Sequence, residues 1–208
     1  MSTLTFQPVL YYGKRLEEIA ERTIHVYEPF FDDYKIAENK EKSDLPERAI
    51  KNLGLPSFFR LDGNELLAFF KNVAKPTIVI TDMVTDWGTT GQAYILGNAG
   101  YVTTSGEIYK IKNQSPYQIS DKNCDERTNL VTWVTVHETG HIIGLLHHLD
   151  TTKPKSGHPC PMSADKDGYT TMSLEYKETI SEHLKEPWKP EEFNLCEDCY
   201  LKIAVLQS

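Results

Sequence analysis

Two histidines that stand four residues apart, His137 and His141, are the clearest candidates for chemistry in the sequence. On an α-helix this spacing turns the second residue by roughly 40° and raises it by about 6 Å, so both imidazoles point to one side and can bind one Zn²⁺ ion. Glu138 lies about 100° round the helix from His137, beside such an ion rather than in its coordination shell. A carboxylate in that position can act as the general base for a zinc-bound water.

A third histidine, His147, follows Gly144 and completes the pattern H-E-x-x-H-x-x-G-x-x-H. Glycine adopts positive φ angles without a steric penalty, so Gly144 can end the helix and turn the chain back toward the metal. Three protein nitrogens leave a fourth position for water, which is typical of catalytic rather than structural zinc. A histidine pair alone could be merely solvated or hydrogen-bonded, but five fixed positions on a predicted helix favour a metal site.

The four cysteines, which are too few to build a disulfide scaffold for this length, are Cys124, Cys160, Cys196 and Cys199. Cys196 and Cys199 form a C-x-x-C pair, a spacing that favours metal or redox chemistry in a reducing compartment. We see no secretory signal at the N-terminus and no apolar run that approaches the length of a membrane span. A cytoplasmic location is therefore expected.

The composition is that of a globular protein, with 39% hydrophobic and 25% charged residues. The length of 208 residues suits one domain, which a cleft can divide into two lobes. The formal net charge of −8 argues against the basic face that binding to nucleic acid or to an anionic membrane needs. We therefore expect neither of these partners.

Hydrophobic patterning predicts a mixture of strands and helices. Short apolar or β-branched runs predict strands at Leu4–Leu10, Thr23–Tyr27, Thr77–Thr81, Ala93–Leu96 and Tyr101–Thr104. Helical periodicity predicts helices at Tyr12–Arg22, Asn64–Ala74, Asn129–Leu146 and Ser173–Leu184, and one after Cys199. Polar residues predict an exposed segment at Ala37–Glu47 and a loop from His148 to Tyr169. This order predicts one α+β domain over residues 1–208, with lobes of about 1–147 and 148–208.

The five motif positions His137, Glu138, His141, Gly144 and His147 match the metzincin signature without a departure, so the chain resembles the metzincin zinc peptidases. The resemblance implies a two-lobed zinc protease with a twisted mixed sheet, an active-site helix and a small irregular C-terminal lobe. It also implies a turn beneath the metal that carries a methionine. Met162 is the candidate for this Met-turn, and Met172 is the weaker one.

Among metzincins the chain is most similar to the archaemetzincins, which carry a cysteine after the third histidine, a C-x-M and a C-x-x-C that together hold a structural zinc. Cys160-Pro161-Met162 and the pair Cys196 and Cys199 match this pattern. His148 stands where the first cysteine is expected, and the spacings from His148 to Cys160 and from Met162 to Cys196 are longer than in that family. An Asp three residues past the third histidine, Asp150, is instead a matrixin feature.

The resemblance therefore implies a second, structural zinc ion held by Cys160, Cys196, Cys199 and a fourth ligand. His148 could complete a Cys₃His set, which is an ordinary structural zinc site. His158 is a second candidate for the fourth ligand. Cys124 is a third, although it precedes the predicted active helix and is expected to be a free thiol. The alternative is that Cys196 and Cys199 are a redox pair or simply reduced.

These features predict a peptidase that hydrolyses peptide bonds with a zinc-bound water and with Glu138 as the general base. The expected partner is a peptide or protein substrate in an extended conformation, lying along an edge strand within Gly91–Tyr101. Two other functions stay open: a zinc-stabilised binding module without peptidase activity, and a zinc hydrolase of a non-peptide amide. The intact Glu138 counts against the binding module, because a purely structural site needs no base.

Overall fold

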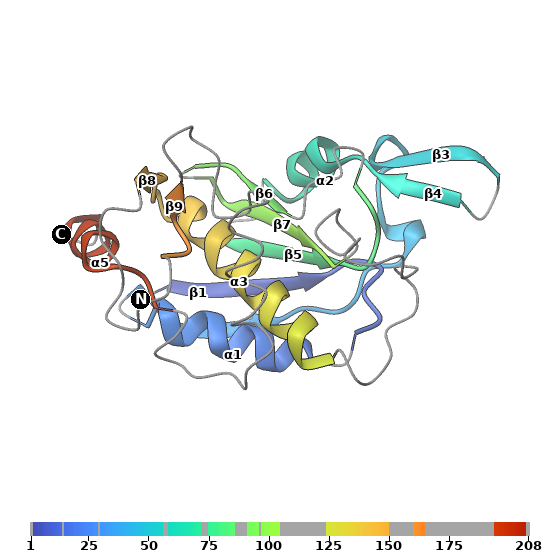
Figure 1. The fold of residues 1–208 in the computed structure, drawn as a ribbon. Helices are drawn as coiled ribbons and strands as arrows, with labels where there is room; N and C mark the ends of the chain where they lie inside the picture. The colour runs from blue at the N-terminus through green and yellow to red at the C-terminus, as the bar shows by residue number, and fades with distance from the viewer. Residues whose placement is uncertain are drawn as a thin grey trace.

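The structure is a computed structural model that describes ten stretches of the chain: residues 2–13, 15–28, 30–55, 58–71, 75–85, 91–95, 97–104, 124–149, 160–164 and 194–206. The predicted helix at 173–184 lies outside them, as do His158 and Met172. The chain builds a central sheet with helices on both faces (Figure 1).

The central sheet has five strands in the order β2-β1-β5-β7-β6. Four of them run parallel: β1 (Ser2–Pro8), β2 (Phe31–Ile36), β5 (Thr77–Thr81) and β7 (Ala99–Thr103). The edge strand β6 (Gly91–Ala93) runs antiparallel to β7, with Gly91 opposite Val102 and Ala93 opposite Gly100. The mixed sheet confirms the predicted fold class.

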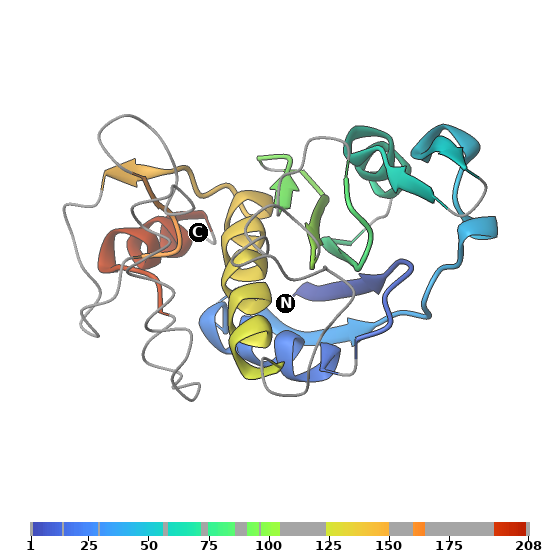
Figure 2. The ribbon, with the colours of Figure 1, turned by 45° about the vertical axis from the view of Figure 1, so that its right-hand side comes forward.

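Helices cover the two faces of this sheet because side chains alternate along each strand. Ile78 and Ile80 of β5 face the core that also contains α1 (Leu16–Val26) and α3 (Cys124–Ile142). Val79 faces the opposite core, which is shared with α2 (Gly63–Phe70). Figure 2 shows α1 and α3 on one side of the sheet and α2 on the other.

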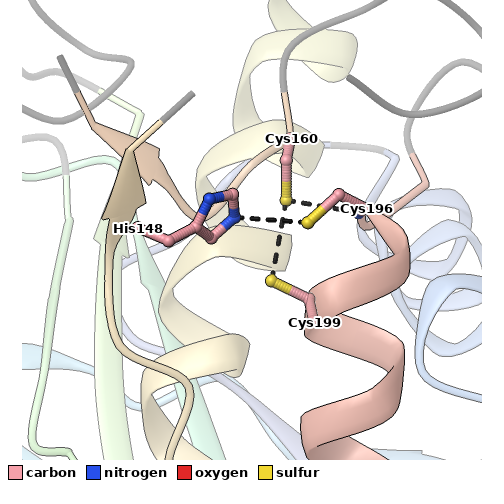
Figure 3. A group of neighbouring side chains, drawn as sticks. All are labelled: His148, Cys160, Cys196 and Cys199. Atoms are coloured by element: carbon pink, nitrogen blue, oxygen red, sulfur yellow. Dashed lines mark hydrogen bonds between the residues drawn. The ribbon is translucent and has the colours of Figure 1, made fainter. Parts of the chain in front are cut away.

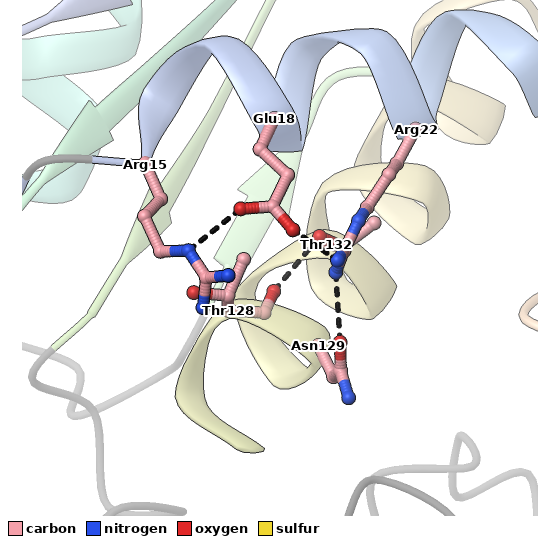
Figure 4. Close-up of polar contacts among 6 residues, drawn as sticks. All are labelled: Arg15, Glu18, Arg22, Thr128, Asn129 and Thr132. Carbon is pink, nitrogen blue, oxygen red and sulfur yellow. Dashed lines mark hydrogen bonds and ion pairs between the residues drawn. The ribbon is translucent and has the colours of Figure 1, made fainter. Parts of the chain in front are cut away.

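Polar contacts also tie α1 to α3 (Figure 4). Glu18 forms ion pairs with Arg22 and, at 2.6 Å, with Arg15. Arg22 then donates a hydrogen bond of 2.7 Å to the side chain of the buried Asn129 on α3. The Thr132 hydroxyl is satisfied within α3, where it donates to the Thr128 carbonyl at 2.8 Å. These contacts fix the first half of the helix that carries the histidines.

The predicted strand at 23–27 is wrong, because α1 continues to Val26. Thr23 is fully buried on this helix and donates its hydroxyl to the Ile19 carbonyl at 2.7 Å. Its β-branched neighbours resembled a strand, but Ile19, Thr23 and Val26 repeat at helical spacing and pack on the core. The second strand is β2, which begins only at Phe31.

Other boundaries are close to the predictions. The strand at 77–81 is confirmed residue for residue as β5, which is buried along its length. The helix predicted at 64–74 begins at Gly63, where the Asp62 side chain accepts from the backbone N–H of Glu65. The helix predicted at 129–146 begins earlier and ends earlier, as α3. Strands β3 (Ile50–Leu55) and β4 (Phe58–Leu61) were also not predicted, and they form a separate antiparallel pair.

The C-terminal part contains more regular structure than the predicted loop from 148 to 169. Two short parallel strands, β8 (His148–Leu149) and β9 (Ser163–Ala164), pair with each other. The last helix, α5 (Glu197–Leu206), begins before Cys199 rather than after it. In the described parts of the chain, no helix is both long and apolar enough to cross a membrane.

Candidate metal centres

Three imidazoles converge beside the C-terminal end of α3, and we call His137, His141 and His147 the histidine tripod. Their Nε2 atoms lie 3.2, 3.0 and 3.2 Å apart. Nitrogen ligands at about 2.0–2.1 Å from one tetrahedral zinc ion would be separated by about 3.3–3.4 Å. The spacing of the tripod is therefore suited to one such ion.

Backbone carbonyls fix which nitrogen of two tripod rings carries a proton. The Nδ1 of His137 donates to the Pro161 carbonyl at 2.6 Å, and the Nδ1 of His141 donates to the Leu145 carbonyl at 2.9 Å. A carbonyl can only accept, so each neutral ring presents an unprotonated Nε2 to the centre of the tripod. Burial lowers the pKa of His137 to about 3, which keeps the ring neutral. Converging lone pairs of this kind repel one another unless a cation lies between them.

Gly144 turns the chain so that His147 can join the other two histidines. It has a φ of 96°, a conformation that a side chain would disfavour. Its N–H donates to the His141 carbonyl at 3.0 Å, and the Leu145 N–H donates to the Gly140 carbonyl at 2.8 Å, which closes the end of α3. The same turn presents the Leu145 carbonyl to His141.

The Glu138 side chain lies beside Gly91, the first residue of edge strand β6, and only 5% of Glu138 is exposed. The backbone of Gly91 passes so close that a Cβ atom there would lie 2.6 Å from Oε1 of Glu138 and 2.8 Å from Val134. Burial raises the pKa of Glu138 to about 8. A dication at the neighbouring tripod would act in the opposite direction and favour the carboxylate.

Met162 lies in a tight turn next to the motif helix. The turn is closed by the Ser163 N–H, which donates to the Cys160 carbonyl at 2.9 Å. Met162 is fully buried, and its sulfur lies 2.4 Å from where a Cβ on Gly140 would be. The structure thus places Met162 against the helix that carries the tripod. The alternative candidate, Met172, is outside the described residues.

A second group of ligand atoms forms what we call the cysteine cluster: His148, Cys160, Cys196 and Cys199 (Figure 3). The sulfurs of Cys160 and Cys199 are 3.8 Å apart, and the sulfur of Cys196 is 3.3 Å from Nε2 of His148. Thiolates at about 2.3 Å from one tetrahedral zinc would be about 3.8 Å apart. Cys160, Cys196 and Cys199 are free of disulfides.

The chemistry of this cluster also suits a cation. A hydrogen bond from Cys196 lowers the pKa of Cys160, but the contact with Cys199 and burial together raise it to about 12. Thiolates in such a place need a positive charge among them. The structure brings His148 into this cluster, whereas His158 falls outside the described residues. Cys124 begins α3, about three and a half helical turns before His137.

Sequence reasoning missed several groups around the tripod. Tyr27 is fully buried and donates its hydroxyl to the Val136 carbonyl at 2.6 Å, one residue before His137. The carbonyls of Pro161 and Leu145, and the close approach of Gly91, were also missed. A backbone carbonyl has no sequence signal of its own, so only the positions of the neighbouring turns could have indicated it.

No protein-family model and no curated protein sequence matches the chain. Among solved structures, the chain is similar to the archaemetzincin of Methanopyrus kandleri, with a TM-score of 0.55, 18% identity and coverage of 99% of this chain and 95% of the other. It is also similar to the archaemetzincin of Archaeoglobus fulgidus, solved with malonate, with a TM-score of 0.51, 14% identity and coverage of 96% and 99%. The fold is therefore archaemetzincin-like.

Met162→Ala is expected to leave a cavity under α3, to cost roughly 2–5 kcal/mol of unfolding free energy and to weaken metal binding at the tripod. Met162→Leu nearly conserves the volume and should cost less than about 1.5 kcal/mol with metal retained. Thermal melts and zinc titrations of both variants, with Met172→Ala as the control, would check this. A tripod that responds to Met172 and not to Met162 would contradict it.

Gly91→Ala should displace the Glu138 carboxyl, because the new methyl group would overlap Oε1. We expect the tripod to keep its zinc while any hydrolysis that depends on Glu138 is largely lost. Gly13→Ala is the control, since its Cβ would also be crowded but by the Tyr11 side chain instead of Glu138. Assays of activity and of bound zinc should separate the two variants, and equal activity losses in both would refute a specific effect on Glu138.

Proposed function

We propose that the chain is a zinc-dependent peptidase. The observation that carries this proposal is a tripod of imidazoles, spaced for one zinc ion, with a buried carboxyl beside it. The archaemetzincin-like fold supports the same conclusion, because the two similar structures are both archaemetzincins.

In this proposal His137, His141 and His147 hold the ion through Nε2. Zinc bound there would act as a Lewis acid that polarises a carbonyl and lowers the pKa of water. Glu138 takes the proton of the attacking water on its carboxylate and returns it to the leaving amine. The carbonyls of Pro161 and Leu145 keep two of the rings oriented throughout.

The substrate in this proposal is an extended peptide that adds to β6. This strand is the last in the order of the central sheet, so one of its edges is unpaired among the described strands. A peptide can bind to such an edge through main-chain hydrogen bonds. At its start the backbone of Gly91 passes next to the Glu138 carboxyl, which supports this strand as the one that leads a substrate to the base.

The cysteine cluster has a structural role in this proposal, since its four ligands leave no open position for water. A binding module without hydrolysis is less well supported. Such a protein would have no use for a carboxyl held in a buried position beside the tripod, where desolvation costs free energy.

Glu138→Gln should keep zinc and lose hydrolysis, with the rate reduced about 10²–10⁴-fold, because the amide cannot accept the proton. Peptide cleavage and metal content would be measured together. Glu38→Gln, which changes an exposed carboxylate far along the chain, is the control and should be fully active. A Glu138→Gln enzyme with wild-type activity would rule out the general-base role.

Metal-replete protein should contain two zinc ions of different lability. The tripod ion has an open coordination position and should leave first when a chelator is added, whereas the ion closed in by the cysteine cluster should stay longer. Elemental analysis during chelator treatment measures both. One zinc per chain in fully loaded protein would contradict the two-centre proposal.

A further inference from the structure

The two centres share two short stretches of chain. His147 belongs to the tripod, and the next residue, His148, belongs to the cysteine cluster. Cys160 belongs to the cluster, and the carbonyl of the next residue, Pro161, accepts the hydrogen bond from His137. A shift of either stretch therefore reaches both centres within one peptide unit.

These two stretches also pair with each other, so they form one unit. The His148 N–H donates to the Met162 carbonyl at 3.1 Å, and His148 lies opposite Ser163 in the β8–β9 ladder. The hydroxyl and the N–H of Ser163 both bond to the Cys160 carbonyl, at 2.8 and 2.9 Å. What fixes one stretch thus fixes the other.

Each strand of this unit is only two residues long, which is short for a β-strand. The other half of the cluster comes from Cys196 and from helix α5, which begins at the next residue and carries Cys199 (Figure 3). The Cys199 sulfur contacts that of Cys160, and the Cys196 N–H donates to the Cys160 sulfur at 3.4 Å. The contacts within the cluster therefore connect α5 to the unit, which lies next to the tripod.

We infer that the cysteine cluster is a positioning device for the tripod: with its ion bound it fixes His147 and the Pro161 carbonyl, and so raises the affinity of the tripod for zinc. This inference rests on the two-centre function proposed above. Partners that orient a ligating imidazole are worth about 10–100-fold in metal affinity, which sets the expected size of the effect. Because coupling between two binding sites is reciprocal, zinc at the tripod must strengthen binding at the cluster by the same factor.

Cys199→Ser tests the coupling, because Cys199 lies on α5 and shares no stretch with a tripod ligand. Competition with a chromophoric chelator measures the zinc affinity of the tripod. Cobalt substitution separates the centres, since thiolate-to-cobalt absorption reports the cluster and is absent from an all-nitrogen site. We expect tripod affinity to fall about 10–100-fold. Cys124→Ser, the matched control at the start of α3, should leave both affinities at the wild-type value.

Two variants of His148 separate positioning from simple loss of a side chain. His148→Ala removes a ligand of the cluster and should weaken the tripod as Cys199→Ser does. His148→Cys restores four ligands and should return the tripod to its wild-type affinity. A His148→Cys protein that binds the cluster ion but keeps a weakened tripod would overturn the inference.

A folded Cys199→Ser protein, by circular dichroism, that lacks the cluster ion and still binds tripod zinc with wild-type affinity would also overturn it. Should that variant not fold, His141→Ala gives the reciprocal measurement: cluster affinity must fall by the same factor, and an unchanged value refutes the coupling. None of these readouts is hydrolysis. A failure here therefore leaves the peptidase proposal standing, whereas wild-type protein that shows the coupling but cleaves no peptide would refute the peptidase alone.

Discussion

The structure depends on one electrostatic constraint, the meeting of three imidazole nitrogens within 3.2 Å of one another. Two of these rings donate their Nδ1 protons to backbone carbonyls outside the tripod. Each therefore presents an Nε2 lone pair, and not an N–H group, to the centre. Such an arrangement persists only when the surrounding chain holds it or when a cation relieves it. The packing around α3 supplies the first condition, and a metal ion would supply the second.

The packing around α3 encloses it, because every residue of the helix from 128 to 142 is buried. The sheet covers one side of it and α1 another, and Met162 fills the space beside Gly140. At two positions the absence of a side chain allows close contact. Met162 and Tyr27 pack against Gly140, and β6 passes next to Glu138 at Gly91. The core packed around α3 thus holds His137 and His141 in place.

The sequence was most informative where a residue type and its spacing both had a chemical meaning. The strand at 77–81 was predicted residue for residue, and the residues expected to form two metal groups do lie together. It was least informative where contacts beyond the local pattern decide. Thr23 is buried on α1 despite its β-branched side chain, and the short strands β3 with β4 and β8 with β9 form by pairing with each other. Carbonyls such as those of Pro161 and Leu145 belong to every residue alike, so no pattern could have singled them out.

The adjacency of His147 and His148 has an evolutionary consequence. One peptide bond separates the two centres, so a single-residue insertion there would move their ligands apart, whereas 11 residues separate His148 from Cys160 and 35 separate Cys160 from Cys196. Closing a longer loop costs little, since doubling its length adds only about 0.6 kcal/mol. Insertions can therefore accumulate between the ligands but not within the pair of histidines. This asymmetry agrees with the sequence, in which the motif spacing matches the metzincin signature while the spacings between the cysteines are longer than in the archaemetzincin pattern.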